Sequence, residues 1–387
     1  MHDTMKRWLV LALALGVCSG NTAAPEPGWT PAEITTLKHW VAAAPEDALP
    51  VLPTHDLDQA LAGPDHAAID QAATRLALAL ARIHLRGATV PTEGQDWHMV
   101  DTDARIDIAA QLGAVLAGSG GSAALDRFFA GARPQSPDYA ILRTAYASER
   151  DPARRATLVL NMERWRWMPR SLAPDHIEVN TASFEVSLWR QGHRVGTWPV
   201  VVGKPKSPTP VFSAEVSGVT FNPWWDVPAD IARESIIGLM RRHPALARQR
   251  GYVHTAGRYR QRPGPANALG QMKLVMPNPF NVYLHDTPEK KLFARDVRAF
   301  SHGCVRVGDA LGFATALMQG TASADAIKAI VATGRTTTVE LAARLPVYVT
   351  YFTATTHADG TLALLPDVYG RDADQGHADD PAHDCAG

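Results

Sequence analysis

The stretch NVYLHDTPEKKLFARDVRAFSHGCVRV, residues 281–307, holds the densest group of chemically reactive side chains in the sequence. A short apolar and aromatic run leads into His285, and a second run surrounds Cys304. Both runs have the composition of β-strands. We therefore expect adjacent strands to bring His285 and Cys304 together, which assigns this part of the chain to a β-rich domain with a site at a strand end.

A thiol and an imidazole at such a site suggest covalent catalysis. Cysteine reacts as the thiolate, and a histidine within hydrogen-bonding distance can take its proton. Asp286 is the simplest group to orient His285, and a backbone carbonyl is the alternative. Gly303 permits a close approach or an unusual φ angle, and the N–H groups around Gly303 and Cys304 could hold an oxyanion. The sequence thus predicts Cys304 as nucleophile and His285 as general base.

Two other interpretations of these residues remain open. His285, His302 and Cys304 could be three ligands of a zinc ion, with His254 as the candidate fourth ligand, although none stands at a typical spacing. Cys304 could also be an inert core thiol or form a disulfide with Cys385. No cofactor is predicted.

The sequence around this stretch predicts a mostly β domain over residues 158–370. Apolar and polar residues alternate there with a period of two, as in strands with one buried face. Gln191-Gly192 is expected to turn one hairpin. The expected strands are 177–180, 184–189, 194–202, 216–221, 273–276, 281–285, 336–340 and 347–353, with helices at 309–318 and 324–332.

A helical insert is expected to interrupt this domain at about residues 229–270. Residues 229–250 have a helical pattern, and a loop rich in Gly, Pro and Arg follows. Its arginines Arg258, Arg260 and Arg262 could bind carboxylates, or they could form a solvated basic loop. Trp224 and Trp225, just before the insert, are either a substrate wall or core residues.

Residues 25–157 predict an all-α domain. This region is Ala-rich, and its clearest helix runs from about residue 66 to Gly87, with apolar residues three or four apart. Further helices are expected at 104–116 and 123–130, and Ser136-Pro137 and Asp151-Pro152 are expected to begin two more. No chemistry is predicted for this domain.

The two ends of the chain have their own signals. Residues 1–24 resemble a signal peptide, with Lys6 and Arg7 before the apolar run WLVLALALGV. A lipoprotein signal at Cys18 is the alternative, although Val17 is a poor fit to the small residue that such a site prefers. Residues 371–387 are rich in Asp and His and are expected to be disordered. Export would place the mature protein in the periplasm or cell envelope.

Composition excludes several classes of protein. The 387 residues contain 38 Lys and Arg against 39 Asp and Glu, so no basic footprint for nucleic acid exists. Three cysteines without a CxxC pair do not make a disulfide scaffold or a zinc ribbon. The mature part of the chain holds no apolar run long enough to span a membrane.

Residues 283–287 and 300–307 together resemble the signature of the L,D-transpeptidases, the YkuD-domain family. The likeness extends over about residues 158–355. The chain resembles in particular the YcbB-like subgroup, whose members have a helical scaffold domain in front of the catalytic domain and a capping insert within it. The segments that carry this subgroup likeness are RWRWMP (164–169), VVG (201–203), PTP (208–210), FNPWW (221–225) and NP (278–279).

This resemblance implies a peptidoglycan L,D-transpeptidase that makes 3→3 cross-links between stem peptides through a cysteine acyl-enzyme. It implies Cys304 as nucleophile and His285 as general base and acid. The residues that it implies as lining the site are Tyr283, Asp286, Ser301, His302, Gly303 and Arg306. Many family members carry Asn in place of Arg306, and a separate peptidoglycan-binding domain is not evident here.

Two alternative functions remain. Water instead of an amine could resolve the thioester, which would make the protein an L,D-carboxypeptidase or hydrolase acting at the same diaminopimelate bond. A non-catalytic wall-binding scaffold is the second alternative, and the intact Cys304 and His285 argue against it. Protein partners cannot be derived from these patterns.

Overall fold

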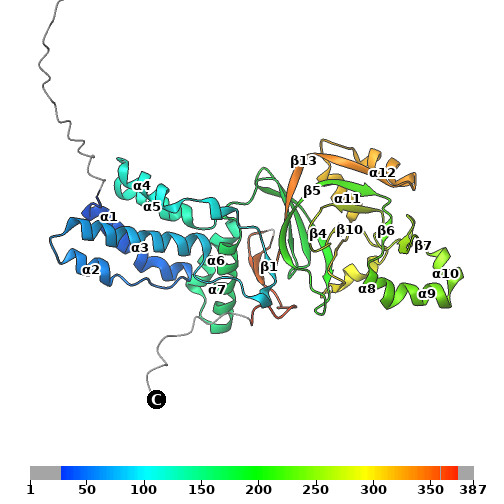
Figure 1. The fold of residues 1–387 in the computed structure, drawn as a ribbon, viewed down its shortest axis with the longest axis horizontal. Helices are drawn as coiled ribbons and strands as arrows, with labels where there is room; N and C mark the ends of the chain where they lie inside the picture. Colours follow the sequence, from blue (N-terminus) through cyan, green and yellow to red (C-terminus); the bar gives the residue numbers. More distant parts are fainter. Residues whose placement is uncertain (1–27, 358, 374–387) are drawn as a thin grey trace, which may run out of the picture.

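The computed structural model describes residues 28–357 and 359–373. A helical half and a β-rich half lie end to end along the long axis of the molecule (Figure 1). This bears out the expected mixture of helices and strands. The predicted signal peptide, Cys18 and Cys385 fall outside the described residues. Within the described part, no helix is both long enough and apolar enough to cross a membrane.

The helical half packs around a core that includes Leu37, Leu80 and Phe129, which are fully buried. Its longest helix ends where Gly87 takes a φ of 88°, the left-handed conformation that glycine adopts readily. The helices are α1 (Pro31–Ala43), α2 (His55–Leu61), α3 (His66–Arg86), α4 (Ile108–Ala117), α5 (Gly121–Ala132), α6 (Pro137–Ser148) and α7 (Pro152–Trp167).

Helix α7 crosses the domain boundary placed at residue 158 from the sequence. The RWRW run of residues 164–167 alternates as a strand would, yet it forms the last turn of this helix. Both arginines are buried because they have internal partners: Arg166 Nη1 donates to Glu163 Oε2 (2.6 Å) and Nη2 to the Tyr139 hydroxyl (2.8 Å). Four alternating residues are too few to distinguish the period of a strand from that of a helix.

The β-rich half is a sheet that closes on itself. The strand order is β1-β5-β13-β2-β3-β4-β12-β10-β9, and β9 also pairs with β5, which completes a ring. The strands are β1 (Trp97–His98), β2 (His176–Asn180), β3 (Glu185–Arg190), β4 (His193–Gly203), β5 (Val211–Phe221), β9 (Met272–Val275), β10 (Leu284–His285), β11 (Ala299–Ser301, on β4), β12 (Val305–Val307) and β13 (Thr337–Thr350).

A single hydrophobic core fills this ring and continues under two helices. Phe212, Phe221 and Leu284 are fully buried in it, and Phe313 of helix α11 (Ala310–Leu317) joins them. Helix α12 (Ala324–Ala332) adds Ile327. The strands expected at 336–340 and 347–353 are one continuous strand, β13, with a register shift between Glu340 and Leu345.

The region predicted as all-α contributes one strand to the sheet. Strand β1 pairs in parallel with the start of β5, with Trp97 beside Val211. Two residues are too short a run for periodicity to reveal a strand. The helical half is therefore joined to the sheet at its edge as well as by the chain.

The insert after β5 contains a hairpin that was expected to be loop. Helices α8 (Ala229–Ile231), α9 (Ile237–Arg242) and α10 (Pro244–Gln249), with the π-helical turn η4 (Ala232–Ile236), precede strands β7 (Tyr252–Thr255) and β8 (Arg258–Gln261). Strand β8 pairs with both β7 and β6 (Trp225–Asp226). Ala256 and Gly257 turn the hairpin with φ angles of 48° and 74°. Ala-Gly is a weaker turn signal than Asn-Gly, so the sequence did not reveal it.

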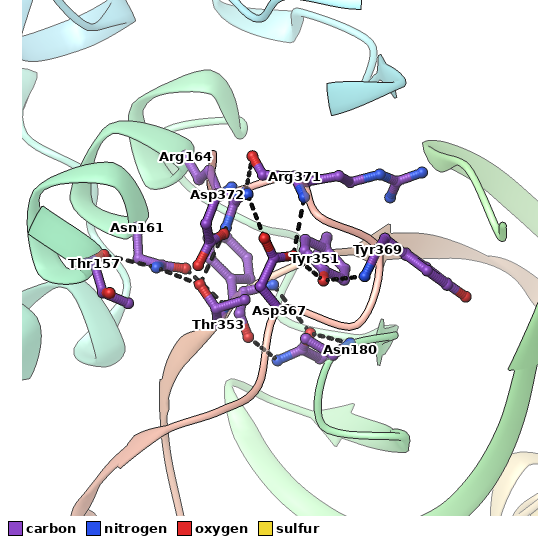
Figure 2. Close-up of polar contacts among 12 residues, drawn as sticks. Thr157, Asn161, Arg164, Asn180, Tyr351, Thr353, Asp367, Tyr369, Arg371 and Asp372 are labelled. Atoms are coloured by element: carbon purple, nitrogen blue, oxygen red, sulfur yellow. Dashed lines mark hydrogen bonds and ion pairs between the residues drawn. The ribbon is translucent and has the colours of Figure 1, made fainter. Parts of the chain in front are cut away.

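A polar seam joins α7 to the end of the described chain (Figure 2). Arg164 is 1% exposed, and its guanidinium donates to Asp372 Oδ1 (2.8 Å) and to the Arg371 carbonyl (3.2 Å). Beside it, Asn161 Nδ2 donates to Thr353 Oγ1 (2.8 Å) and Asn161 Oδ1 accepts from the Thr353 amide (2.9 Å). The seam therefore ties the helical half to residues that follow β13, at Thr353 and at the end of the described chain.

The disordered tail was predicted to begin at residue 371, which is too early in the chain. Arg371 is 3% exposed, lies over the rings of Tyr351 and Tyr369, and donates to Asp96 Oδ2 (3.0 Å). The Asp- and His-rich composition of this segment gives no sign that Arg371 has partners elsewhere in the fold. Residues 374–387 fall outside the described part of the chain.

Candidate active site

Three neighbouring strands present one common face. Lys273 of β9 is in register with His285 of β10, and His285 is in register with Arg306 of β12. Side chains two residues apart on a strand share a face, so Tyr283 and Cys304 join them, and Val305 N donates to Tyr283 O (3.0 Å) to continue the ladder. The opposite face is the hydrophobic core. The structure thus gathers a thiol, an imidazole and two cations on one side of the sheet.

Cys304 is a free, half-buried thiol immediately before β12. Its Sγ donates to the backbone carbonyl of Asn281 at 3.8 Å. Burial raises the pKa of this thiol, while the Tyr283 backbone and the charges of Lys273 and Arg306 act in the opposite direction. The thiol is therefore protonated in the resting site and needs a base before it can react.

His285 is 5% exposed, and its imidazole is held in one tautomer. Nδ1 lies within hydrogen-bonding distance of the Asp286 carbonyl, which can only accept, so Nδ1 carries the proton and Nε2 is left as the acceptor. Burial, together with the positive charges of Arg306 and Lys273, lowers the pKa of His285 to about 3, against the opposing effect of the hydrogen bond to the Asp286 carbonyl. A neutral imidazole with a free Nε2 is the form that a general base requires.

The carboxylate of Asp286 does not orient His285, contrary to the simpler expectation. The backbone carbonyl of the same residue does, which is the alternative that the sequence left open. The buried carboxylate instead accepts from the Gln271 amide (Oδ2, 2.8 Å) and pairs with Lys290. Asp286 thus fixes the loop ends around β10 and acts on the imidazole through its main chain.

The turn before the nucleophile is held by hydroxyl groups. Gly303 has a φ of 112°, a conformation that residues with a Cβ rarely adopt. Ser301 Oγ accepts from the Gly303 amide (3.1 Å) and donates to the Cys304 carbonyl (2.6 Å). Thr209 Oγ1 donates to the Gly303 carbonyl (2.8 Å). The Gly303 amide is therefore engaged, and of the two predicted oxyanion donors the Cys304 amide is the remaining candidate.

His302 lies at the rim of the site and contacts the capping insert. Its Nε2 is 3.0 Å from Glu234 Oε2, in the π-helical turn, and 3.2 Å from Lys204 Nζ. A single ring nitrogen cannot donate to Glu234 and accept from Lys204 at once, so the two contacts are alternatives. Among the described residues, no three His, Cys, Asp or Glu side chains are grouped as metal ligands. The proposed zinc set of His285, His302 and Cys304 is not assembled.

Two cavities flank the common face. One of about 580 Å³ is lined by residues that include Trp224, Arg260, Lys273, Asn281 and Tyr283. The other, of about 610 Å³, lies under the insert. Both cavities are lined by Asn281 and Tyr283, and the first brings Trp224 and one insert arginine beside the common face.

The other predicted residues of the insert have different places. Arg258 lines the second cavity, together with Asn281 and Tyr283. Arg262 is exposed, and Trp225 pairs with Gln261 in the small sheet of the insert. Only part of the predicted basic cluster therefore faces the candidate site.

Lys273 and Thr209 belong to the site but were not predicted from the sequence. Lys273 is a lone cation in the apolar strand MKLV, and its place on the face of His285 follows only from the register of β9 and β10. Thr209 lies in the PTP segment already noted, but its contact with Gly303 spans residues far apart in the sequence. Both omissions come from pairings that a single sequence does not reveal.

Comparison with known families agrees with this geometry. Residues 174–345 match the family model of the L,D-transpeptidase catalytic domain, YkuD. A Haemophilus influenzae protein provisionally named as an L,D-transpeptidase is 31% identical over 237 residues, which are 56% of this chain and 48% of that protein. The chain thus spans about half the length of this curated relative. These matches support a catalytic domain of the YkuD L,D-transpeptidase family within the β-rich half.

Solved structures give weaker likenesses. L,D-transpeptidase 3 from Mycobacterium tuberculosis is 15% identical, over 46% of this chain and 61% of that chain, with a TM-score of 0.26. An L,D-transpeptidase from Mycobacterium smegmatis is 16% identical, over 46% and 59% respectively, with a TM-score of 0.25.

Proposed function

We propose that this protein is a peptidoglycan L,D-transpeptidase that forms 3→3 cross-links between stem peptides through an acyl-enzyme at Cys304. The observation that carries the proposal is the common face of β9, β10 and β12. There a protonated thiol, just before β12, and a neutral imidazole of fixed tautomer on β10 lie inside the segment that matches the catalytic domain.

Acylation would use the groups of this face in turn. Nε2 of His285 takes the thiol proton as Sγ of Cys304 attacks the carbonyl carbon at the L-centre of diaminopimelate. The Cys304 amide is the candidate donor to the resulting oxyanion. Collapse breaks the amide bond to the terminal D-Ala, and the imidazolium returns its proton to the departing amine. The products are a thioester and free D-Ala.

The second half-reaction consumes the thioester. The side-chain amine of another stem's diaminopimelate attacks the thioester carbonyl and loses a proton to His285. The C–S bond breaks, and the Cys304 thiolate recovers a proton from the imidazolium. The new amide joins two diaminopimelate residues. Water in place of the amine would release a tripeptide, so the same face also accommodates the hydrolase alternative.

The surroundings of the pair support this division of roles. Arg306 and Lys273 stabilise negative charge on Sγ and oppose positive charge on His285, so the resting pair is neutral. Ser301 and Thr209 fix the Gly303 turn from which the thiol projects. We extend the proposal to the YcbB-like subgroup and to an exported protein of the periplasm or cell envelope, on the resemblance and the signal peptide of the sequence.

Mass spectrometry of the purified protein with a disaccharide-tetrapeptide tests the proposal. A cross-linked dimer with loss of D-Ala supports transpeptidation, and a tripeptide without dimer supports the hydrolase. Neither product above the level of a Cys304→Ala control would overturn both. A Lys328→Met variant should form product as wild type does, because Lys328 lies on α12 with its side chain 74% exposed.

A further inference from the structure

Lys273 is an unusual residue for its position. Its neighbours on β9, Met272 and Leu274, are fully buried in the core, while Lys273 is half-buried on the other face. Its Nζ lies 3.8 Å from the centre of the Tyr283 ring. A partly buried ammonium group normally has a compensating carboxylate. Among the residues that the structure describes, no hydrogen bond or ion pair supplies one to Lys273.

The carboxylate whose charge acts on Lys273, that of Asp226, is already engaged. Asp226 lies close enough for its charge to raise the pKa of Lys273, against the lowering that burial causes. However, Asp226 Oδ1 accepts from Arg260 Nε at 2.6 Å. Arg260 therefore has its carboxylate, and Lys273 faces the cavity of about 580 Å³ that both residues line. The ammonium is left with an aromatic face on one side and open space beside it.

Lys273 also acts directly on the reactive pair. Its register with His285 places it on the nucleophile's face, and its charge and that of Cys304 affect each other's pKa. A carboxylate at Lys273 would thus lie next to the thiol that attacks the substrate.

We propose that Lys273 is the carboxylate anchor of this site, where its ammonium binds a carboxylate of the acyl donor beside Cys304. The identity of the donor rests on the proposed function. A tetrapeptide stem carries two candidate carboxylates, one on the terminal D-Ala and one on the D-centre of diaminopimelate. Both are the same chemistry, and the experiments below separate them.

The anchor also links substrate binding to activation of His285. In the empty site, Lys273 and Arg306 both disfavour the imidazolium that proton transfer must form. A carboxylate bound to Lys273 neutralises one of these charges, so the imidazole becomes a better base once the donor is present. A donor without that carboxylate is then bound less tightly and attacked more slowly.

Alkylation of Cys304 tests the anchor without requiring turnover. In both iodoacetate and iodoacetamide, the Cys304 thiolate attacks the CH₂ carbon and displaces iodide into solvent, and only iodoacetate carries a carboxylate. The ratio of their rates cancels any change in the ionisation of the thiol. We expect Lys273→Met to lower the iodoacetate-to-iodoacetamide ratio roughly tenfold, as for loss of one charge-assisted contact. Mass spectrometry of the Cys304 peptide gives both rates.

Two further variants sharpen this test. Lys273→Arg keeps the charge and should restore most of the ratio. Lys328→Met removes an exposed lysine on α12 and should leave it unchanged. A ratio in Lys273→Met equal to that of wild type would overturn the anchor, whatever reaction the protein performs.

Amidated donors identify the carboxylate. We expect wild type to lose roughly tenfold in kcat/KM when the anchored carboxylate is converted to the amide, and Lys273→Met to lose little more on the same change. The anchor would be refuted if Lys273→Met lowered kcat/KM by the same factor relative to wild type with the free donor and with the amidated donor. That result would leave the proposed function standing. Wild type that turns over no donor would refute the proposed function, and the alkylation ratio would still decide on the anchor.

Discussion

Replacing His285 by alanine removes the base from a thiol that cannot ionise well alone. Burial raises the pKa of Cys304 above its ordinary value. Because that pKa is raised, little of the thiol is ionised at pH 7 without a base, and loss of the base slows attack. General acid–base residues typically contribute about 10²–10⁴, and His285 also protonates the leaving amine. We therefore expect acylation by the tetrapeptide to fall by about 10²–10⁴ at pH 7.

The pH dependence distinguishes this explanation from a structural one. In His285→Ala, the acylation rate should rise about tenfold per pH unit toward the pKa of the thiol, because ionisation alone then limits attack. Wild type should show no such rise, since its imidazole is neutral at every pH well above about 3. The readout is the mass of the acyl-enzyme after short reaction times at a series of pH values.

A matched control is His193→Ala, an exposed histidine at the start of β4, which should acylate like wild type. Acylation of His285→Ala at the wild-type rate near pH 7 would refute the base assignment. Stoichiometric zinc in wild type, together with inactivation by a chelator, would instead favour the metal interpretation.

Three further predictions concern the nucleophile, the half-buried Glu178 and the polar seam at Arg164. Cys304→Ala should abolish cross-linking and leave the thermal midpoint near that of wild type, and residual cross-linking would contradict the nucleophile assignment. Burial raises the pKa of Glu178 to about 7, so the stability that its protonated form provides is lost as pH rises through 7. In urea unfolding, Glu178→Gln should therefore gain more stability relative to wild type at pH 8 than at pH 5. An equal effect at both pH values would count against this assignment. Arg164→Ala should cost about 3–5 kcal/mol by leaving Asp372 without its buried partner, whereas Arg344→Ala, in an exposed pair, should cost under about 1 kcal/mol, and equal costs would argue against the seam.

Elements with a long local pattern were predictable from the sequence. The apolar spacing before Gly87 predicted α3 nearly to its ends, and the Gln191-Gly192 turn predicted the β3–β4 hairpin. The helix expected at 309–318 is α11, and Asp309 caps it, because its side chain accepts from the Gly312 amide (3.0 Å). In each case the determining interactions lie within a few residues of one another.

Features that depend on distant partners were not predictable. The hairpin of β7 and β8 is held in place because β8 pairs with β6, which lies more than thirty residues earlier in the chain. From the sequence, either the Asp286 carboxylate or a backbone carbonyl could orient His285. Choosing the Asp286 carbonyl over its carboxylate required the positions of Gln271 and Lys290. Arg371 appeared to belong to a polar tail because Asp96 and the two tyrosine rings lie elsewhere in the sequence.

The seam at Arg164 has a consequence for the order in which the molecule can fold. The guanidinium of Arg164 and the carboxylate of Asp372 are 208 positions apart in the chain. During synthesis α7 emerges long before that carboxylate exists, and a buried cation without its partner is strongly unfavourable. The last turn of α7 can therefore settle only after β13 and the residues beyond it have been made. Contacts of such long range slow folding, so the two halves reach their final packing together and late.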